Sequence, residues 1–161
     1  NVTLVIGDEK LKLSKDYLAV HSPVFAAMFF GGNAEKGKEE VEIKEIVYEE
    51  FIDLLNIIYL GTLEIIDRTV LHILNLAVRF QIELVVSLSE KHLMKSTKFD
   101  VAKKLMLADQ YRLTSLKDHC LQSFTSIADL TGKLKSSHEF ANYSEWMKAA
   151  ICEQIMKLKL Q

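Results

Sequence analysis

The stretch 32–38 is the first whose residue types and spacing could carry out chemistry. Two glycines with four residues between them, followed by a lysine, match the start of a phosphate-binding loop: Gly32, Gly37 and Lys38. In such a loop a Ser or Thr comes next to hold magnesium, and a helix follows whose N-terminus faces the phosphate. Here Glu39 comes next, and the following pattern predicts a strand. We therefore expect no nucleotide site.

The histidines and cysteines offer no better arrangement for catalysis. None of the five histidines lies at metal-ligand spacing from another histidine, a cysteine or a carboxylate. His119 and Cys120 are neighbours, but adjacent residues on a helix point about 100° apart. Cys120 falls on an apolar face with Leu116 and Phe124, which predicts a buried structural thiol. We expect no catalytic residue, no metal and no cofactor, so the chain is not expected to be an enzyme.

The composition is that of a globular protein. The 161 residues are 49% hydrophobic and 26% charged, which excludes a disordered chain. Twenty basic and 22 acidic residues nearly cancel, which argues against a nucleic-acid partner. The apolar runs stop short of the ~18 residues that a membrane span needs, and two cysteines without C-x-x-C spacing fit a reducing compartment. We expect an intracellular protein, cytoplasmic, nuclear or both, with no membrane partner.

The first part of the chain predicts a small sheet. A β-branched run over 2–6, turn residues at 7–8 and alternating residues over 10–13 predict a hairpin, and residues 41–43 predict a third strand. Between them, Ser22 before a proline predicts the start of a short apolar helix that glycines end after Phe30.

Helices are predicted for most of the rest. Apolar residues from Phe51 to Ile58 recur at helical spacing, and Gly61 follows as the residue that ends the helix. Asp67 is expected to cap the next helix, and another covers about 84–95. The predicted core comprises Phe25, Met28, Leu54, Leu55, Leu74 and Ala77.

An internal repeat is the strongest pattern in the sequence. Residues 70–93 match residues 101–124 at an offset of 31 positions, and each copy reads as a helix, a tight turn and a second helix. Thr97 with Asp100, and Ser115 with Asp118, have the spacing of capping boxes for the second copy. Ser144 is expected to cap a terminal helix. The fold class is therefore α+β: a small three-stranded sheet covered by helical hairpins, followed by an all-helical extension.

The run LAVHSPVFAAMF at 18–29 resembles the signature of the BTB/POZ domain. The other elements follow in the order of that family: a first strand at 2–6, a third strand at 41–43, a helix that ends with Tyr59 and Gly61, and a closing helical hairpin at 70–93. The resemblance covers 1–95. Residues 96–161 resemble the BACK-like helical extension of substrate adaptors of cullin-3 ubiquitin ligases, above all the MATH-BTB adaptors.

The resemblance assigns cullin binding to the loop after the short helix. The family motif there is a hydrophobic residue, any residue and Glu, which corresponds to Asn33, Ala34 and Glu35. The acid is kept, whereas the hydrophobic anchor is replaced by Asn. Tyr59, at the end of a nearby helix, is expected to border the same surface.

Self-association is the second implication of the resemblance. Tyr17, Val20 and Val24 correspond to the dimer surface, and the residues alone indicate no core role for Tyr17. Asn1 and Ser14 depart from the Asp and His usual in the family, so roles of those residues do not carry over.

A non-enzymatic adaptor is therefore the expected function. The chain would form a homodimer, bind the N-terminal region of cullin-3, and hold a substrate protein through a domain absent from this chain. Since the sequence starts with a strand and without Met, we expect it to be a piece of a longer protein. The alternative is a BTB oligomerisation or scaffolding module that binds no cullin, which the replacement at Asn33 favours.

Overall fold

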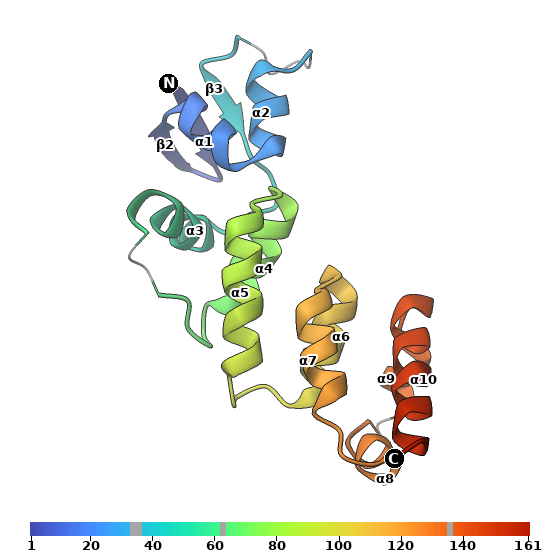
Figure 1. Ribbon diagram of the computed structural model, residues 1–161. Coiled ribbons are helices and arrows are strands. Elements are labelled where there is room, and N and C mark those ends of the chain that lie inside the picture. Colours follow the sequence, from blue (N-terminus) through green and yellow to red (C-terminus); the bar gives the residue numbers. More distant parts are fainter. Residues whose placement is uncertain (33–36, 62–63, 135–136) are drawn as a thin grey trace. The chain divides into compact units, whose positions relative to one another are not determined.

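A computed structural model describes residues 1–32, 37–61, 64–134 and 137–161 (Figure 1). The chain forms two compact units, Asn1–Ser89 and Glu90–Gln161. The boundary between the two units falls inside helix α5 (Glu83–Lys95). Each unit is described in turn.

A three-stranded sheet forms one part of the first unit. Strands β1 (Val2–Ile6), β2 (Glu9–Leu13) and β3 (Glu40–Glu42) lie in the order β2-β1-β3. β1 is antiparallel to β2 and parallel to β3. Alternate residues of β1 are buried, so one face of this strand points to the core. The predicted third strand is confirmed with a shift of one residue at each end.

Two short helices follow the hairpin, α1 (Lys15–His21) and α2 (Pro23–Phe30). The sequence analysis missed α1, because seven residues with mixed polarity show no clear helical period. Ser22 ends α1 and caps α2, as its position before proline predicted. Its buried hydroxyl accepts from the Phe25 N–H at 3.1 Å and donates to the Phe80 carbonyl at 2.5 Å.

Helices α3 (Tyr48–Leu60) and α4 (Val70–Arg79) complete the first unit together with the start of α5. Gly61 ends α3 in the left-handed conformation, with φ of 59°, as predicted. The predicted cap Asp67 is wrong. Thr69 occupies the cap position, because a turn closed by the Thr69 N–H and the Ile66 carbonyl at 3.0 Å delays the helix.

Four phenylalanine rings form the centre of the first unit. Phe25 stacks on Phe80 with ring centroids 4.6 Å apart, and Phe51 meets both rings edge to face. Phe29 stacks on Phe25 at 5.6 Å. Of the six predicted core residues, all are buried except Met28, which is half-exposed. α2 is apolar on every side, so periodicity could not identify its buried face.

The second unit contains α6 (Val101–Tyr111), α7 (Thr114–Gln122), α8 (Ile127–Lys133), α9 (Ser137–Asn142) and α10 (Glu145–Lys159). The part of the chain after Lys95 that the structure describes has helices as its only regular elements, as predicted. α10 lies beside α7 and α8 (Figure 1). The fold class α+β with a helical extension is confirmed.

The two copies of the predicted repeat have the same backbone geometry in their turns. Gln81 and Arg112, at equivalent positions, both have positive φ, 53° and 56°. The next residue in each copy donates its N–H to the carbonyl of an equivalent alanine, Ile82 to Ala77 at 2.8 Å and Leu113 to Ala108 at 2.9 Å. The two copies therefore share one helix-ending motif.

The helix caps of the second unit differ from the predicted capping boxes. Asp100, and not Thr97, caps α6 by accepting from the Lys103 N–H at 2.8 Å. The start of α7 uses a side chain distant in sequence, because Glu90 accepts from the Leu116 N–H at 2.7 Å and Ser115 makes no cap. Local spacing cannot reveal such a partner.

Ser144 caps α10 as predicted, by accepting from the Met147 N–H at 3.3 Å. The Asp109 carboxylate accepts from both the Ser144 hydroxyl and the Ser144 N–H. These bonds join the start of α10 to α6.

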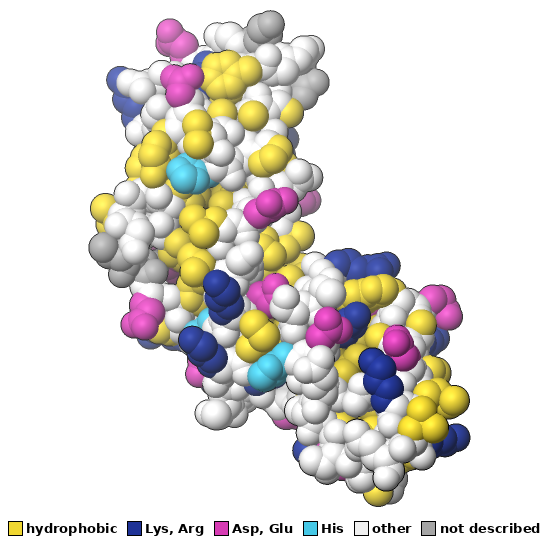
Figure 2. Space-filling view, viewed as in Figure 1, with side chains coloured by type: hydrophobic (Ala, Val, Ile, Leu, Met, Phe, Trp, Pro, Cys, Tyr) yellow, Lys and Arg dark blue, Asp and Glu magenta, His cyan; other side chains and the backbone are white. Residues whose placement is uncertain are grey.

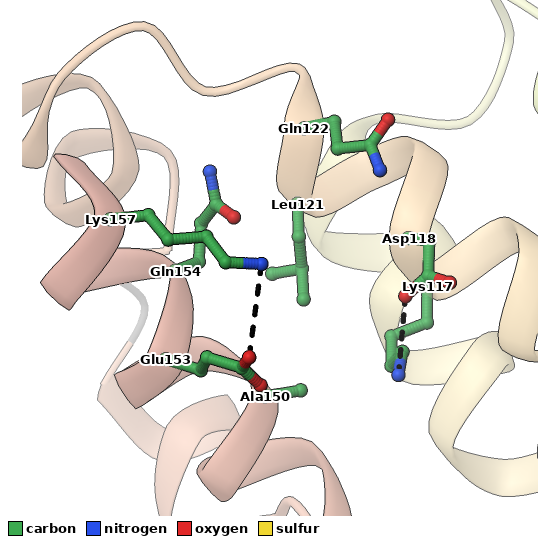
Figure 3. Close-up of a pocket in the computed structure, with 8 residues that line it drawn as sticks. All are labelled: Lys117, Asp118, Leu121, Gln122, Ala150, Glu153, Gln154 and Lys157. Carbon is green, nitrogen blue, oxygen red and sulfur yellow. Dashed lines mark ion pairs between the residues drawn. The ribbon is translucent and has the colours of Figure 1, made fainter.

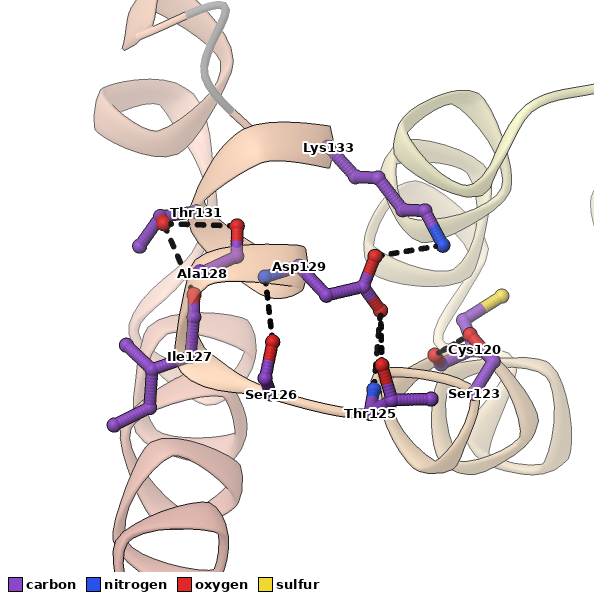
Figure 4. Close-up of polar contacts among 9 residues, drawn as sticks. All are labelled: Cys120, Ser123, Thr125, Ser126, Ile127, Ala128, Asp129, Thr131 and Lys133. Atoms are coloured by element: carbon purple, nitrogen blue, oxygen red, sulfur yellow. Dashed lines mark hydrogen bonds and ion pairs between the residues drawn. The ribbon is translucent and has the colours of Figure 1, made fainter.

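Asp129 holds the short helix α8 in place (Figure 4). Its carboxylate accepts from the Thr125 N–H at 3.0 Å and pairs with the Lys133 ammonium at 3.0 Å. The hydrogen bond from the Thr125 backbone, followed by the contact with Lys133, lowers the pKa of Asp129. Ser126 caps the helix.

A glycine at position 81 is expected to stabilise the first unit. Gln81 is exposed and has a φ of 53°, a conformation that costs residues other than glycine about 1 kcal/mol or more. Gln81→Gly should therefore raise the free energy of unfolding by ~0.5–1 kcal/mol in urea denaturation, after the greater entropy of unfolded glycine is included. Ser87→Gly, at an exposed position inside α5, is the control and should destabilise. A loss of stability in Gln81→Gly would contradict this account of the turn.

Candidate protein-interaction surface

The loop between α2 and β3 carries the residues to which the resemblance assigned cullin binding. Asn33, Ala34 and Glu35 lie outside the described residues, so their predicted role stays a prediction. The described part of this loop starts at Gly37 and leads into β3. The other predicted contact, Tyr59, lies in the last turn of α3 with 39% of its surface exposed.

Tyr17 of α1 contacts the end of α3. Its hydroxyl donates a hydrogen bond to the Ile58 carbonyl at 2.8 Å. Its ring stacks on the ring of Tyr59, with centroids 4.4 Å apart and an interplanar angle of 26°. Tyr17 therefore has an intramolecular role that the residue pattern did not indicate, because its partners lie about forty residues away in the sequence.

The hydroxyl of Tyr59 lies close to the backbone of Ser14. Partial burial raises the pKa of the Tyr59 phenol, and a hydrogen bond with the Ser14 backbone opposes that shift only in part. The phenol is therefore neutral at physiological pH. Its ring remains half-exposed while its position is fixed by α1.

The first turn of α1 also contacts the loop. The Lys15 ammonium donates a hydrogen bond to the Lys38 carbonyl at 3.0 Å. Ser14 and Tyr17, on either side of Lys15, contact the last turn of α3. One turn of one helix thus holds the described end of the loop and the aromatic residue Tyr59.

The predicted dimer residues lie around the junction of α1 and α2. Val20 is 81% exposed, Val24 is half-exposed, and Tyr17 is half-buried against α3. Figure 2 shows hydrophobic side chains over α1 and beside α3, and charged side chains scattered over the rest of this face. An exposed apolar surface of this kind is typical of protein-interaction sites.

The structure brings together one acid–base pair that the sequence analysis did not identify. His72 Nε2 of α4 lies 2.8 Å from Asp53 Oδ2 of α3. The two residues are 19 positions apart, so no local spacing indicated the contact. This half-exposed contact joins α3 to α4.

Of the two cysteines, Cys120 is buried and Cys152 is exposed. Burial raises the pKa of the Cys120 thiol to about 11, so this cysteine is a structural thiol, as predicted. Among the described residues, no group of three or more His, Cys, Asp or Glu side chains could hold a metal ion. Within the same residues, no helix is long and apolar enough to cross a membrane.

A small pocket lies between α7 and α10 (Figure 3). Its volume is 70 Å³, well below the ~300 Å³ at which pockets begin to hold organic ligands. Lys117 pairs with Asp118 at 3.2 Å and Lys157 pairs with Glu153 at 3.8 Å, so the ionic groups at its rim have partners. The surface built by α1, α2 and the end of α3 is the candidate site, because it combines exposed apolar side chains with the stacked ring of Tyr59.

Comparison with known proteins agrees with this interpretation. The family described as "BTB/POZ domain" matches residues 1–97. The chain is 39% identical over 158 residues to "BTB and MATH domain-containing protein 38" of Caenorhabditis elegans, a match that covers 98% of this chain and 41% of that protein. "BTB and MATH domain-containing protein 36" of the same organism is 32% identical over 158 residues, 98% of this chain and 49% of that protein.

A plant protein is also similar to this chain over part of its own length. "BTB/POZ and MATH domain-containing protein 3" of Arabidopsis thaliana is 32% identical over 149 residues, 84% of this chain and 36% of that protein. The chain thus spans less than half the length of each of these three relatives. Together with the sheet and helices described above, the match over residues 1–97 shows that the chain belongs to the BTB/POZ domain family, whose members are protein-interaction modules.

Proposed function

We propose that the chain is the self-associating, cullin-binding part of a substrate adaptor of a cullin-3 ubiquitin ligase. One observation carries this proposal. In a BTB/POZ chain, the first turn of α1 contacts both Lys38, at the described end of the loop, and the aromatic ring of Tyr59. The resemblance to cullin-3 adaptors assigns this loop and Tyr59 to cullin binding.

The roles that we propose for the two parts of the chain are those known for the family. Residues 1–95 act as the BTB/POZ domain, and residues 96–161 act as a BACK-like helical extension. The relatives carry a MATH domain in their names, so we assign substrate binding in the whole protein to a domain of that kind. The adaptor itself performs no catalysis.

Self-association is proposed through Tyr17, Val20 and Val24. A two-fold axis through the junction of α1 and α2 would pair each copy of this apolar surface with itself. The exposure of Val20 supports this assignment, because an aliphatic side chain with 81% of its surface in water gains from a partner.

Two substitutions in the loop test the cullin assignment. Asn33 cannot fill an apolar pocket, so Asn33→Met should tighten binding to the cullin-3 N-terminal region by ~1–2 kcal/mol. Glu35→Lys should weaken cullin binding by about as much, because the polar contact of Glu35 is lost and its negative charge becomes positive. Both affinities are measured by isothermal titration calorimetry with the full chain.

The control is Glu9→Lys, which makes the same charge reversal at an exposed position on β2 and should leave the affinity unchanged. The scaffolding alternative predicts a different result. If the loop variants bound with unchanged affinity, the assignment of the loop to the cullin would be wrong. If no binding were detectable in any variant, the chain would be an oligomerisation module without a cullin.

A further inference from the structure

We infer that Tyr17 is a positioning residue, which acts on cullin binding by fixing Tyr59 on the contact surface. This inference rests on the proposed function and adds a residue role to it. Tyr17 was assigned only to the dimer surface, and its contacts with α3 give it a second and separate task.

The hydroxyl of Tyr17 satisfies a carbonyl at the end of α3. The last four carbonyls of a helix have no partner within the helix. The Ile57 carbonyl accepts from the Gly61 N–H at 3.1 Å, and the next carbonyl, that of Ile58, accepts from Tyr17. The O···O distance of 2.8 Å is normal for a strong hydroxyl hydrogen bond. Tyr17 is therefore attached to the backbone directly before Tyr59.

The ring of Tyr17 then supports the ring of Tyr59. The two rings stack at 4.4 Å, and His21, one helical turn after Tyr17, lies 4.8 Å from the Tyr17 ring. The Tyr59 ring is thus restrained by the stack and still has 39% of its surface exposed.

A restrained and exposed aromatic ring is well suited to be an anchor in a protein interface. Binding normally costs conformational entropy because exposed side chains become ordered. For Tyr59 part of that order already exists in the free protein, because its ring stacks on the ring of Tyr17. Removal of Tyr17 should therefore weaken cullin binding even though Tyr17 need not contact the cullin.

A double-mutant cycle tests this role, with affinity for the cullin-3 N-terminal region measured by isothermal titration calorimetry. Tyr59→Ala should weaken binding about tenfold or more, and Tyr17→Leu about five- to tenfold. Tyr17→Phe keeps the ring stack and should weaken binding only about two- to threefold. The double variant Tyr17→Leu/Tyr59→Ala should bind within about twofold of Tyr59→Ala alone, because Tyr17 acts through Tyr59.

A spectroscopic measurement on the free protein accompanies the cycle. In NMR spectra of the chain with labelled tyrosine, the ring signals of Tyr59 should keep their positions in Tyr17→Phe and shift in Tyr17→Leu. Tyr48→Leu, at the other end of α3, is the matched control and should change neither the Tyr59 signals nor the affinity. Circular dichroism of each variant verifies the fold.

The outcomes separate this inference from the proposed function. If the wild-type chain binds the cullin but the losses from Tyr17→Leu and Tyr59→Ala add, Tyr17 acts independently and the positioning role is wrong. Unchanged Tyr59 signals in Tyr17→Leu would have the same meaning. If the wild-type chain shows no affinity for the cullin, the proposed function falls, and the positioning role falls with it.

Discussion

Replacement of Phe25 by alanine is expected to lower the free energy of unfolding by about 3–5 kcal/mol. Phe25 has 1% of its surface exposed and contacts three other phenylalanine rings, those of Phe29, Phe51 and Phe80. Its removal leaves a cavity that rigid neighbouring rings cannot fill. Urea denaturation followed by circular dichroism measures the loss.

The control for this variant lies in the same helix. Phe30 is 51% exposed and meets only Phe29 among the ring contacts of the described residues. Phe30→Ala should therefore cost less than about 1 kcal/mol. Equal losses in the two variants would show that the assigned core is wrong.

The second large effect is expected for Ser22→Ala, with a loss of about 2–4 kcal/mol. The hydroxyl of Ser22 is fully buried and makes two hydrogen bonds. Loss of the cap at the Phe25 N–H costs about 1 kcal/mol. The Phe80 carbonyl is left without its donor, and a buried unsatisfied carbonyl costs about 1–3 kcal/mol more.

Ser14→Ala provides the comparison for this prediction. Ser14 caps α1 through one bond, from the Tyr17 N–H at 3.3 Å, and it is only half-buried. Its replacement should cost about 0.5–1 kcal/mol. If Ser22→Ala were no more harmful than Ser14→Ala, the bond to Phe80 would contribute nothing to stability.

Much of this fold could be predicted from local patterns. The repeat at an offset of 31 positions is one case, since it predicted equivalent hairpins and the structure gives both turns the same positive φ, at Gln81 and Arg112. Gly61 and Ser144 are others, because helix ends depend on residues that adjoin them.

The missed features depend on contacts that are distant in sequence. Glu90 caps α7 from 26 residues away, and no spacing rule covers such a pair. Met28 was expected in the core because α2 is apolar on all sides, and only tertiary packing decides that Phe25 and Phe29 face inward. The helix α1 is too short to show a period.

The candidate surface also combines features that depend on local sequence with contacts between residues that are distant in sequence. Tyr59 lies at the end of α3 and Val20 is exposed, while their roles in cullin binding and dimerisation stay predictions. The stack of Tyr17 on Tyr59 and the bond from Lys15 to Lys38 join segments about 23 to 42 residues apart, so only the folded chain reveals them.

The central claim is that this BTB/POZ chain pairs with itself and binds a cullin. Light scattering on a size-exclusion column, with the chain mixed at high concentration with the cullin-3 N-terminal region, tests both parts at once. We predict one complex whose mass equals two chains and two cullin fragments. Separate peaks, with the mass of a free cullin fragment and of the chain alone, would contradict the adaptor role.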